Sequence, residues 1–161
     1  MAANRSCRVW FWVGWLAGIA VVAAAVPAAA AEIDVTFLAT SDCHYASVKN
    51  VDRNERNAET IRQMNVLPGT AWPDRLGGGA IGRPSGVLVL GDIVDDGDRK
   101  GETPVQWKHF VKQFGLTGKD GLLAYPVVEG WGNHDGPPAG KQKQEFSVQE
   151  QLRSRNAVRR E

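Results

Sequence analysis

Three short polar clusters contain residue types that bind metal ions. They lie at residues 41–44, 91–98 and 132–135. Carboxylate, imidazole and amide groups are hard or borderline ligands that suit iron, manganese or zinc. In an extended segment, residues i and i+2 face the same side, so Asp42 and His44 can reach one ion together. The clusters therefore predict a metal site, provided that the fold brings them together.

The second and third clusters add chemical groups that the first one lacks. Asp92 can place its two carboxylate oxygens on two ions at once, and Asn133 offers a neutral amide oxygen. His134, beside Asp135, is a candidate proton donor. These groups can ligate a metal ion and move a proton beside it.

Each cluster taken alone also has a simpler interpretation. An Asp-x-His triplet is common in surface turns, and the acidic residues at 95–98 would form a solvated loop. A calcium-binding loop beginning at Asp92 is excluded, because Val94 and Thr103 stand where that loop needs an oxygen ligand and a glutamate. Only the joint occurrence of the three clusters favours a metal site.

The segments that must position these clusters alternate between strand and helix patterns. Apolar, β-branched runs predict strands at residues 33–40, 86–90 and about 123–128. Apolar residues at helical spacing predict helices at 54–66, at 104–114 with Thr103 as the cap, and after Ser147. This alternation is typical of an α/β domain with a largely parallel sheet, in which ligands bind at the carboxyl ends of the strands. Each polar cluster follows one predicted strand.

Local signals predict details of these elements. Thr103 and Gln106 have the spacing of a capping box, and Ser147 and Glu150 repeat that spacing at the last helix. Residues 68–85, rich in glycine and proline, predict a long irregular excursion.

Further details concern glycine and arginine. Gly91 and Gly132 would allow the backbone to approach the site closely. The arginines of the last helix predict a solvated helix end, which the helix dipole favours; they are Arg153, Arg155, Arg159 and Arg160.

Residues 1–31 have the pattern of a secretory signal peptide. Arg5 and Arg8 precede an uncharged, largely apolar stretch that ends in alanines, with cleavage expected after Ala31. The alternative is an uncleaved membrane anchor, since the stretch reaches the roughly 20 residues that span a bilayer. We expect an exported protein, periplasmic or extracellular, whose domain is 32–161 and which has no stable membrane association after cleavage.

Charge and cysteine content limit the classes of partner. The chain has 161 residues and a formal net charge of +1. Removing residues 1–31 takes away two basic residues and no acidic one, which leaves 17 basic against 18 acidic residues. A nearly neutral chain does not indicate a nucleic-acid partner. Cys43 is the only cysteine in 32–161, so that domain has no internal disulfide.

The three clusters, in this order, resemble the calcineurin-like metallophosphoesterase family. The family pattern is D-x-H, then G-D-x-x-D, then G-N-H-[DE], and the chain matches all three motifs within about residues 34–135. The resemblance implies an α/β sandwich, of which this chain would contain the N-terminal portion and lack the C-terminal part. It also implies hydrolysis of a phosphomonoester or phosphodiester, and hence a phosphate ester as substrate.

The resemblance implies a dinuclear site with bridging hydroxide. Asp42 and His44 would bind the first of two divalent or trivalent ions (iron, manganese or zinc), Asp92 would bridge both ions, and Asn133 would bind the second.

The resemblance also implies the catalytic residues. His134 would lie over the phosphate and assist the leaving group. Either Asp95 or Asp135 would hold its imidazole, with Asp95 favoured by the second motif.

The family's further metal-binding histidines have no counterpart in this chain. The chain has three histidines, of which His109 falls on the predicted surface of a helix. We therefore expect an incomplete two-metal site, belonging to a truncated enzyme, to a degenerate relative or to a protein completed by a partner. The alternative function is a non-catalytic, exported remnant of the family that binds a metal or phosphate.

Overall fold

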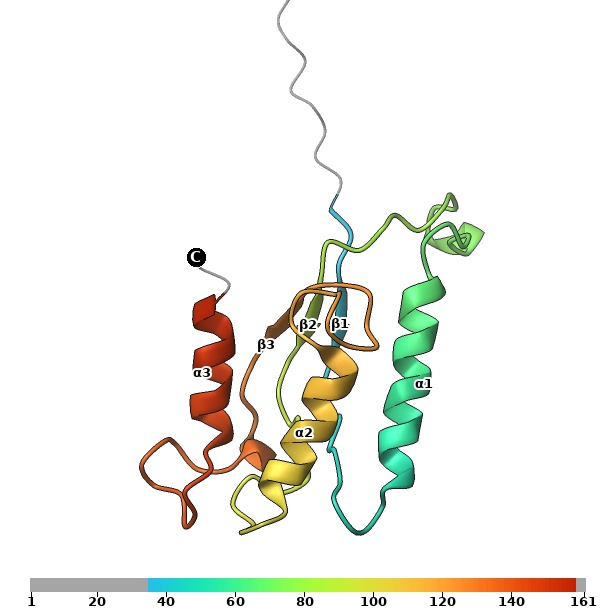
Figure 1. The fold of residues 1–161 in the computed structure, drawn as a ribbon. Coiled ribbons are helices and arrows are strands. Elements are labelled where there is room, and N and C mark those ends of the chain that lie inside the picture. The colour runs from blue at the N-terminus through green and yellow to red at the C-terminus, as the bar shows by residue number, and fades with distance from the viewer. Residues whose placement is uncertain (1–34, 159–161) are drawn as a thin grey trace, which may run out of the picture. The chain divides into compact units, whose positions relative to one another are not determined.

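The protein is described by a computed structural model covering residues 35–158, so the predicted signal peptide lies outside the described residues. Strands and helices alternate along the chain, as Figure 1 shows. They are β1 (Leu38–Thr40), α1 (Asp52–Val66), β2 (Val87–Val89), α2 (Thr103–Phe114), β3 (Val127–Glu129) and α3 (Val148–Val158), with short 3-10 turns η1 (Asp74–Leu76) and η2 (Asn133–Asp135). Within residues 35–158, no helix is long and apolar enough to span a bilayer.

The three strands form one parallel sheet in the order β1-β2-β3. Leu38 lies opposite Val87, and Val87 lies opposite Val127. Crossover connections between parallel strands are right-handed, so two crossovers that advance in one direction place their helices on the same face. Accordingly α1 and α2 lie side by side over the sheet, and α3 lies beside β3 (Figure 1). The predicted α/β class is therefore confirmed.

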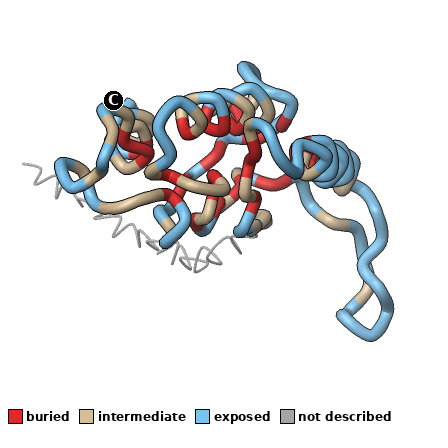
Figure 2. The backbone as a smooth tube through the Cα atoms, turned by 90° about the horizontal axis from the view of Figure 1, so that it is seen from below, coloured by how far each residue is buried: buried red, intermediate tan, exposed pale blue. Residues whose placement is uncertain are grey.

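The core lies between the helices and the helix-facing side of the sheet, where Figure 2 shows the buried residues. Val87, Val89 and Val127 are fully buried there, as is Phe110 of α2. Burying a side chain of this size contributes about 1.5 to 3 kcal/mol. The core side chains are Cys43, Tyr45, Ile61, Met64, Val87, Val89, Ile93, Val94, Trp107, Phe110, Phe114, Leu123, Tyr125, Val127, Val148 and Leu152.

The opposite face of the sheet is apolar and open among the described residues. Side chains alternate between the two faces of a strand, so Phe37, Leu90 and Val128 point away from the helices. Their side chains are 58%, 62% and 48% exposed. The described elements therefore form a two-layer unit, with helices on one face only.

The observed element boundaries differ modestly from those predicted. Helix α1 begins two residues before its predicted start, and α2 begins one residue before its predicted start and ends at the predicted residue. The strands are shorter than predicted, because the ladder includes three residues of each strand. The third strand also begins later, since Pro126 pairs in an isolated antiparallel bridge with Thr117 before β3 starts. Residues 68–85 form the predicted irregular excursion, which extends from the end of α1 (Figure 1).

One predicted cap is wrong and the other is confirmed. Thr103 is the first residue of α2, and Glu102 at the N-cap makes no side-chain capping bond. The Thr103 hydroxyl instead bonds the main chain of Asp96 and Arg99, and Gln106 accepts the Asp96 amide. Both side chains therefore hold the loop after β2. At α3, the Glu150 amide donates to Ser147 Oγ over 3.3 Å, as predicted.

The interpretation of the arginines as a solvated helix end is wrong for Arg155. Its guanidinium pairs with the buried carboxylate of Glu129 at 2.7 Å and also donates to the Gly115 carbonyl. The Arg155 side chain is 14% exposed and that of Glu129 is fully buried. Arg155 therefore attaches α3 to β3.

Candidate metal centre

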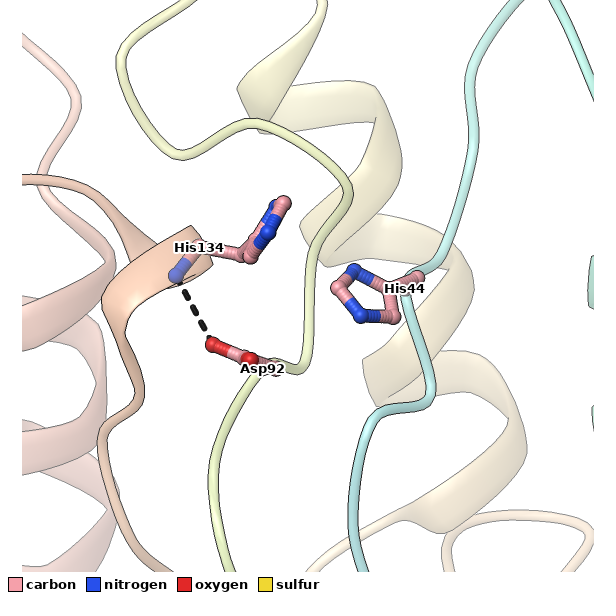
Figure 3. A group of neighbouring side chains, drawn as sticks. All are labelled: His44, Asp92 and His134. Atoms are coloured by element: carbon pink, nitrogen blue, oxygen red, sulfur yellow. Dashed lines mark hydrogen bonds between the residues drawn. The ribbon is translucent and has the colours of Figure 1, made fainter.

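The loops that follow the three strands bring together His44, Asp92 and His134. One potential ligand atom from each of these residues lies within 4.8 Å of the others. Figure 3 shows that the three side chains come from three separate segments of the chain and lie near one another. The His44 and His134 rings contact edge to face, with centroids 4.5 Å apart. His44 and Asp92 therefore offer an imidazole nitrogen and a carboxylate oxygen as candidate metal ligands, with the His134 imidazole beside them.

Three of the predicted site residues have strained main-chain conformations. The φ angles of Asp42, His44 and Asp92 are 55°, 42° and 49°, in the left-handed region that non-glycine residues rarely adopt. The expectation of an extended segment at 42–44 was therefore wrong. Asp42 and His44 nevertheless lie together, with Asp42 Oδ1 3.8 Å from His44 Nε2. Strain of this kind persists where surrounding contacts impose it, and it concentrates at functional sites.

Main-chain hydrogen bonds hold the first two loops beside each other. The His44 amide donates to the Asp92 carbonyl over 3.0 Å, and the Tyr45 amide donates to the Ile93 carbonyl over 2.8 Å. The parallel pairing thus continues beyond β1 and β2. It places the main chain of His44 opposite that of Asp92, independently of any contact between their side chains.

A close approach of two glycines joins the second and third loops. A Cβ atom on Gly91 would lie 2.6 Å from the Gly132 nitrogen, and one on Gly132 would overlap the main chain and carboxylate of Asp92. Real Cβ atoms do not approach other atoms so closely, so both positions require glycine. The predicted close approach at Gly91 and Gly132 is confirmed.

Asp135 connects the same two loops from inside. Its side chain is almost fully buried, and its carboxylate accepts hydrogen bonds from the amides of Ile93, Val94 and Gly132 over 2.8, 3.1 and 2.9 Å. Burial raises the pKa of the Asp135 carboxyl, although the three amides act in the opposite direction. The hydrogen bonds of the Asp135 carboxylate are therefore with main-chain amides.

The main-chain carbonyl of Asp95 holds the imidazole of His134. Nδ1 lies 2.9 Å from that oxygen, and the His134 amide donates to Asp92 Oδ1 over 2.7 Å. A carbonyl only accepts hydrogen bonds, so Nδ1 carries the proton and Nε2 of the neutral ring has a free lone pair. The same hydrogen bond raises the pKa of His134, and the nearby carboxylates of Asp92, Asp95 and Asp135 add to the effect. The imidazolium form is therefore favoured.

The remaining predicted residues lie around this group. The Asp42 side chain is 63% exposed beside His44. Asn133 lines an open groove of about 690 Å³ together with His134, Asp95 and the half-exposed Trp131. Cys43 is buried, and burial raises the pKa of its thiol to about 12, so this thiol stays protonated at neutral pH and is a poor metal ligand.

One nitrogen of His44 supports a bound ion. Nδ1 is buried and has no hydrogen-bond partner among the described residues. A buried polar atom without a partner is costly, and its usual explanation is a water molecule or an ion. Imidazole and carboxylate donors suit the iron, manganese or zinc predicted from the sequence.

The sequence analysis missed three polar side chains of α1 that contact the first loop. Asn54 exchanges two hydrogen bonds with the main chain of Ala46, each 2.9 Å long. Asn57 donates to the Cys43 carbonyl over 2.7 Å, and Arg53 donates to the His44 carbonyl over 3.2 Å. Nothing in the spacing of Arg53, Asn54 and Asn57 distinguishes them from ordinary surface residues of a helix. Only their tertiary contacts reveal the role.

Comparison with protein-family models gives a match that agrees with this geometry. The model described as calcineurin-like phosphoesterase matches residues 35–159. Comparison with curated proteins gave no match, and neither did comparison with solved structures.

Proposed function

Because the chain belongs to the calcineurin-like phosphoesterase family, we propose that its metal centre serves the hydrolysis of a phosphomonoester or phosphodiester. The observation that carries this proposal is the convergence of His44, Asp92 and His134, from three separate loops, to within 4.8 Å. Three matched motifs without such a convergence would support no common chemistry.

The assignment of ligands follows the order of the motifs. Asp42 and His44 would hold one ion, and Asp92 would bridge that ion to a second one. Asn133 would be the other ligand of the second ion among the described residues. A bound ion supplies two kinds of chemistry: it lowers the pKa of a coordinated water and polarises a phosphate oxygen. The acidic side chains and the buried His44 nitrogen support binding of a cation.

His134 is the proposed proton donor to the leaving group. Its Nδ1 is engaged by the Asp95 carbonyl, so only Nε2 is available to a substrate. The neutral ring has no proton on Nε2, and donation therefore requires the imidazolium form. The Asp95 carbonyl raises the pKa of His134, which increases the fraction of imidazolium at a given pH.

A second function is supported by the histidine count. The chain has three histidines, and two of them are at the centre, so few ligands remain for a second ion. A protein with one metal position would bind a metal or phosphate without turnover.

In either case we propose that the protein is exported, on the basis of the charge and apolar pattern of residues 1–31.

Replacing Asp92 by asparagine tests the proposal. Binding of Mn²⁺ and Zn²⁺ to the full chain would be measured by calorimetry, and hydrolysis of p-nitrophenyl phosphate and bis(p-nitrophenyl) phosphate by absorbance. We expect Asp92→Asn to weaken metal binding by at least about tenfold and hydrolysis by about a hundredfold or more, because loss of a group that merely hydrogen-bonds a metal ligand already costs about 10- to 100-fold. The matched control is Asp74→Asn, at an exposed aspartate of η1.

The outcomes separate the two functions. Metal binding and turnover that are both lost in Asp92→Asn and retained in Asp74→Asn support the hydrolase. Metal binding without turnover in the unaltered chain supports the binding protein. Unchanged hydrolysis in Asp92→Asn overturns the proposed site.

A further inference from the structure

We propose that Arg53 of α1 is a positioning residue that sets the orientation and tautomer of His134 by holding the Asp95 segment against the His44 segment. This inference rests on the proposed function only in giving His134 a role. The positioning itself concerns this chain's own residues and is testable without metal or substrate.

Arg53 joins the first two loops through one nitrogen. Its Nη1 donates to Asp95 Oδ1 over 2.6 Å and to the His44 carbonyl over 3.2 Å. The side chains of Arg53 and Asp95 are 27% and 34% exposed, so solvent screens this pair less than a fully exposed one. Charge-assisted hydrogen bonds of this length are among the strong ones. Arg53 thereby fixes the Asp95 carboxylate beside the His44 segment.

The effect of Arg53 reaches His134 through the main chain of Asp95. The carboxylate and the carbonyl belong to one residue, so fixing the former limits the motion of the latter. That carbonyl lies 2.9 Å from His134 Nδ1 and requires a proton there. Neutral histidine in water favours a proton on Nε2, so the environment selects the less common tautomer. The His134 ring is thus held through Nδ1, which leaves Nε2 free of the Asp95 contact.

The loop after β1 is also held by contacts that do not involve Arg53, so its support can be distinguished from the positioning of Asp95. Asn54 and Asn57 hold the main chain of Ala46 and Cys43, and the Asp95 amide donates to the Tyr45 carbonyl over 3.0 Å. These bonds do not involve Arg53 and remain when it is replaced. Loss of Arg53 should therefore free the Asp95 carboxylate and loosen its carbonyl, while the loop after β1 stays in place.

The test uses nitrogen-15 histidine labelling of the full chain without metal, at a fixed pH where the imidazoles are neutral. The chain has three histidines, so long-range proton–nitrogen spectra resolve each ring and report its tautomer. The variants are Arg53→Met and Arg53→Lys. The control is Arg56→Met, which removes an exposed arginine of the same helix that pairs with Asp52. His109 of α2 serves as an internal reference.

We expect a predominant Nδ1–H tautomer of His134 in the unaltered chain. Arg53→Met should shift the tautomer ratio by about tenfold toward Nε2–H, the effect of about one net hydrogen bond. Arg53→Lys should give a smaller shift, because an ammonium keeps the charge but does not reproduce the guanidinium geometry. Arg56→Met should leave the ratio unchanged.

Two results would overturn the inference. One is an unchanged Nδ1–H signature in a folded Arg53→Met variant. If that variant does not fold by circular dichroism, Arg53→Lys decides, and an unchanged ratio there also overturns it. Neither result depends on hydrolysis, so failure of this inference is distinguishable from failure of the proposed function.

Discussion

At the scale of single residues, the candidate centre depends on conformations that side-chain chemistry alone does not require. Asp42, His44 and Asp92 have left-handed φ angles, and Gly91 and Gly132 pass too close together for any Cβ atom. These positions support one another, since the glycine contact places Asp92 and the main-chain pairing places His44. A small change at one of them should therefore affect the whole centre.

The two glycines that flank Trp131 provide a matched prediction at this scale. Gly132→Ala should lower the free energy of unfolding by about 1 to 3 kcal/mol and weaken metal binding, because the new Cβ overlaps Asp92. In Gly130→Ala the nearest atom would lie at 3.5 Å, an ordinary contact, so we expect a change within about 0.5 kcal/mol. Urea unfolding and calorimetry measure both quantities. Equal effects of the two substitutions would contradict this account of the glycine contact.

At the scale of elements, each helix combines packing with a polar attachment to the sheet or its loops. Arg53, Asn54 and Asn57 attach α1 to the first loop. Arg155 attaches α3 to Glu129 of β3, and its guanidinium also lies over the rings of Trp107 and Phe110 at 5.9 and 5.6 Å. The helices therefore position the loops of the centre as well as covering the core.

The buried pair between α3 and β3 leads to a prediction at this scale. Arg155→Met should lower the free energy of unfolding by about 1.5 to 3 kcal/mol, because it removes a charge-assisted hydrogen bond to the buried Glu129 carboxylate. The double variant Arg155→Met/Glu129→Leu should lose markedly less than the sum of the two single variants. Arg153→Met, at an exposed position of the same helix, is the control. Additive effects in thermal or urea unfolding would show that the pair is not coupled.

At the scale of the whole described unit, helices cover one face of the sheet and the other face remains apolar. This follows from two crossovers of the same hand in a sheet whose strand order is sequential. Phe37, Leu90 and Val128 lie on the open face. Exposed large apolar side chains on one face of a sheet favour association.

The open face predicts measurable dye binding and self-association by the full chain. Replacing Phe37 and Leu90 together by threonine keeps residues that suit a sheet and removes most of the large apolar surface. We expect weaker fluorescence of a hydrophobic dye and a smaller weight-average sedimentation coefficient. Stability should change by about 0.5 kcal/mol or less per site, as is usual for exposed positions. Dye binding equal to that of the unaltered chain would contradict the exposure of this face.

The sequence by itself determined the alternation of strands and helices and the residues of the candidate centre. Periodicity reports local burial, so helix α2 was predicted to within one residue of its observed bounds and the parallel α/β class followed. The motif residues His44, Asp92 and His134 carry distinctive chemistry at predicted strand ends, and they lie together in the structure. Boundaries of the short strands were less well predicted, since pairing partners decide where a ladder ends.

Only the tertiary structure decided which groups act on the motif residues. The Asp95 main-chain carbonyl, and not a carboxylate, holds His134. Arg53 holds Asp95, and Arg155 is an internal partner of Glu129 rather than a solvated residue. The physical reason is that such hydrogen bonds and ion pairs join residues far apart in the chain, and residue type and spacing do not specify a partner until the fold has brought the groups together.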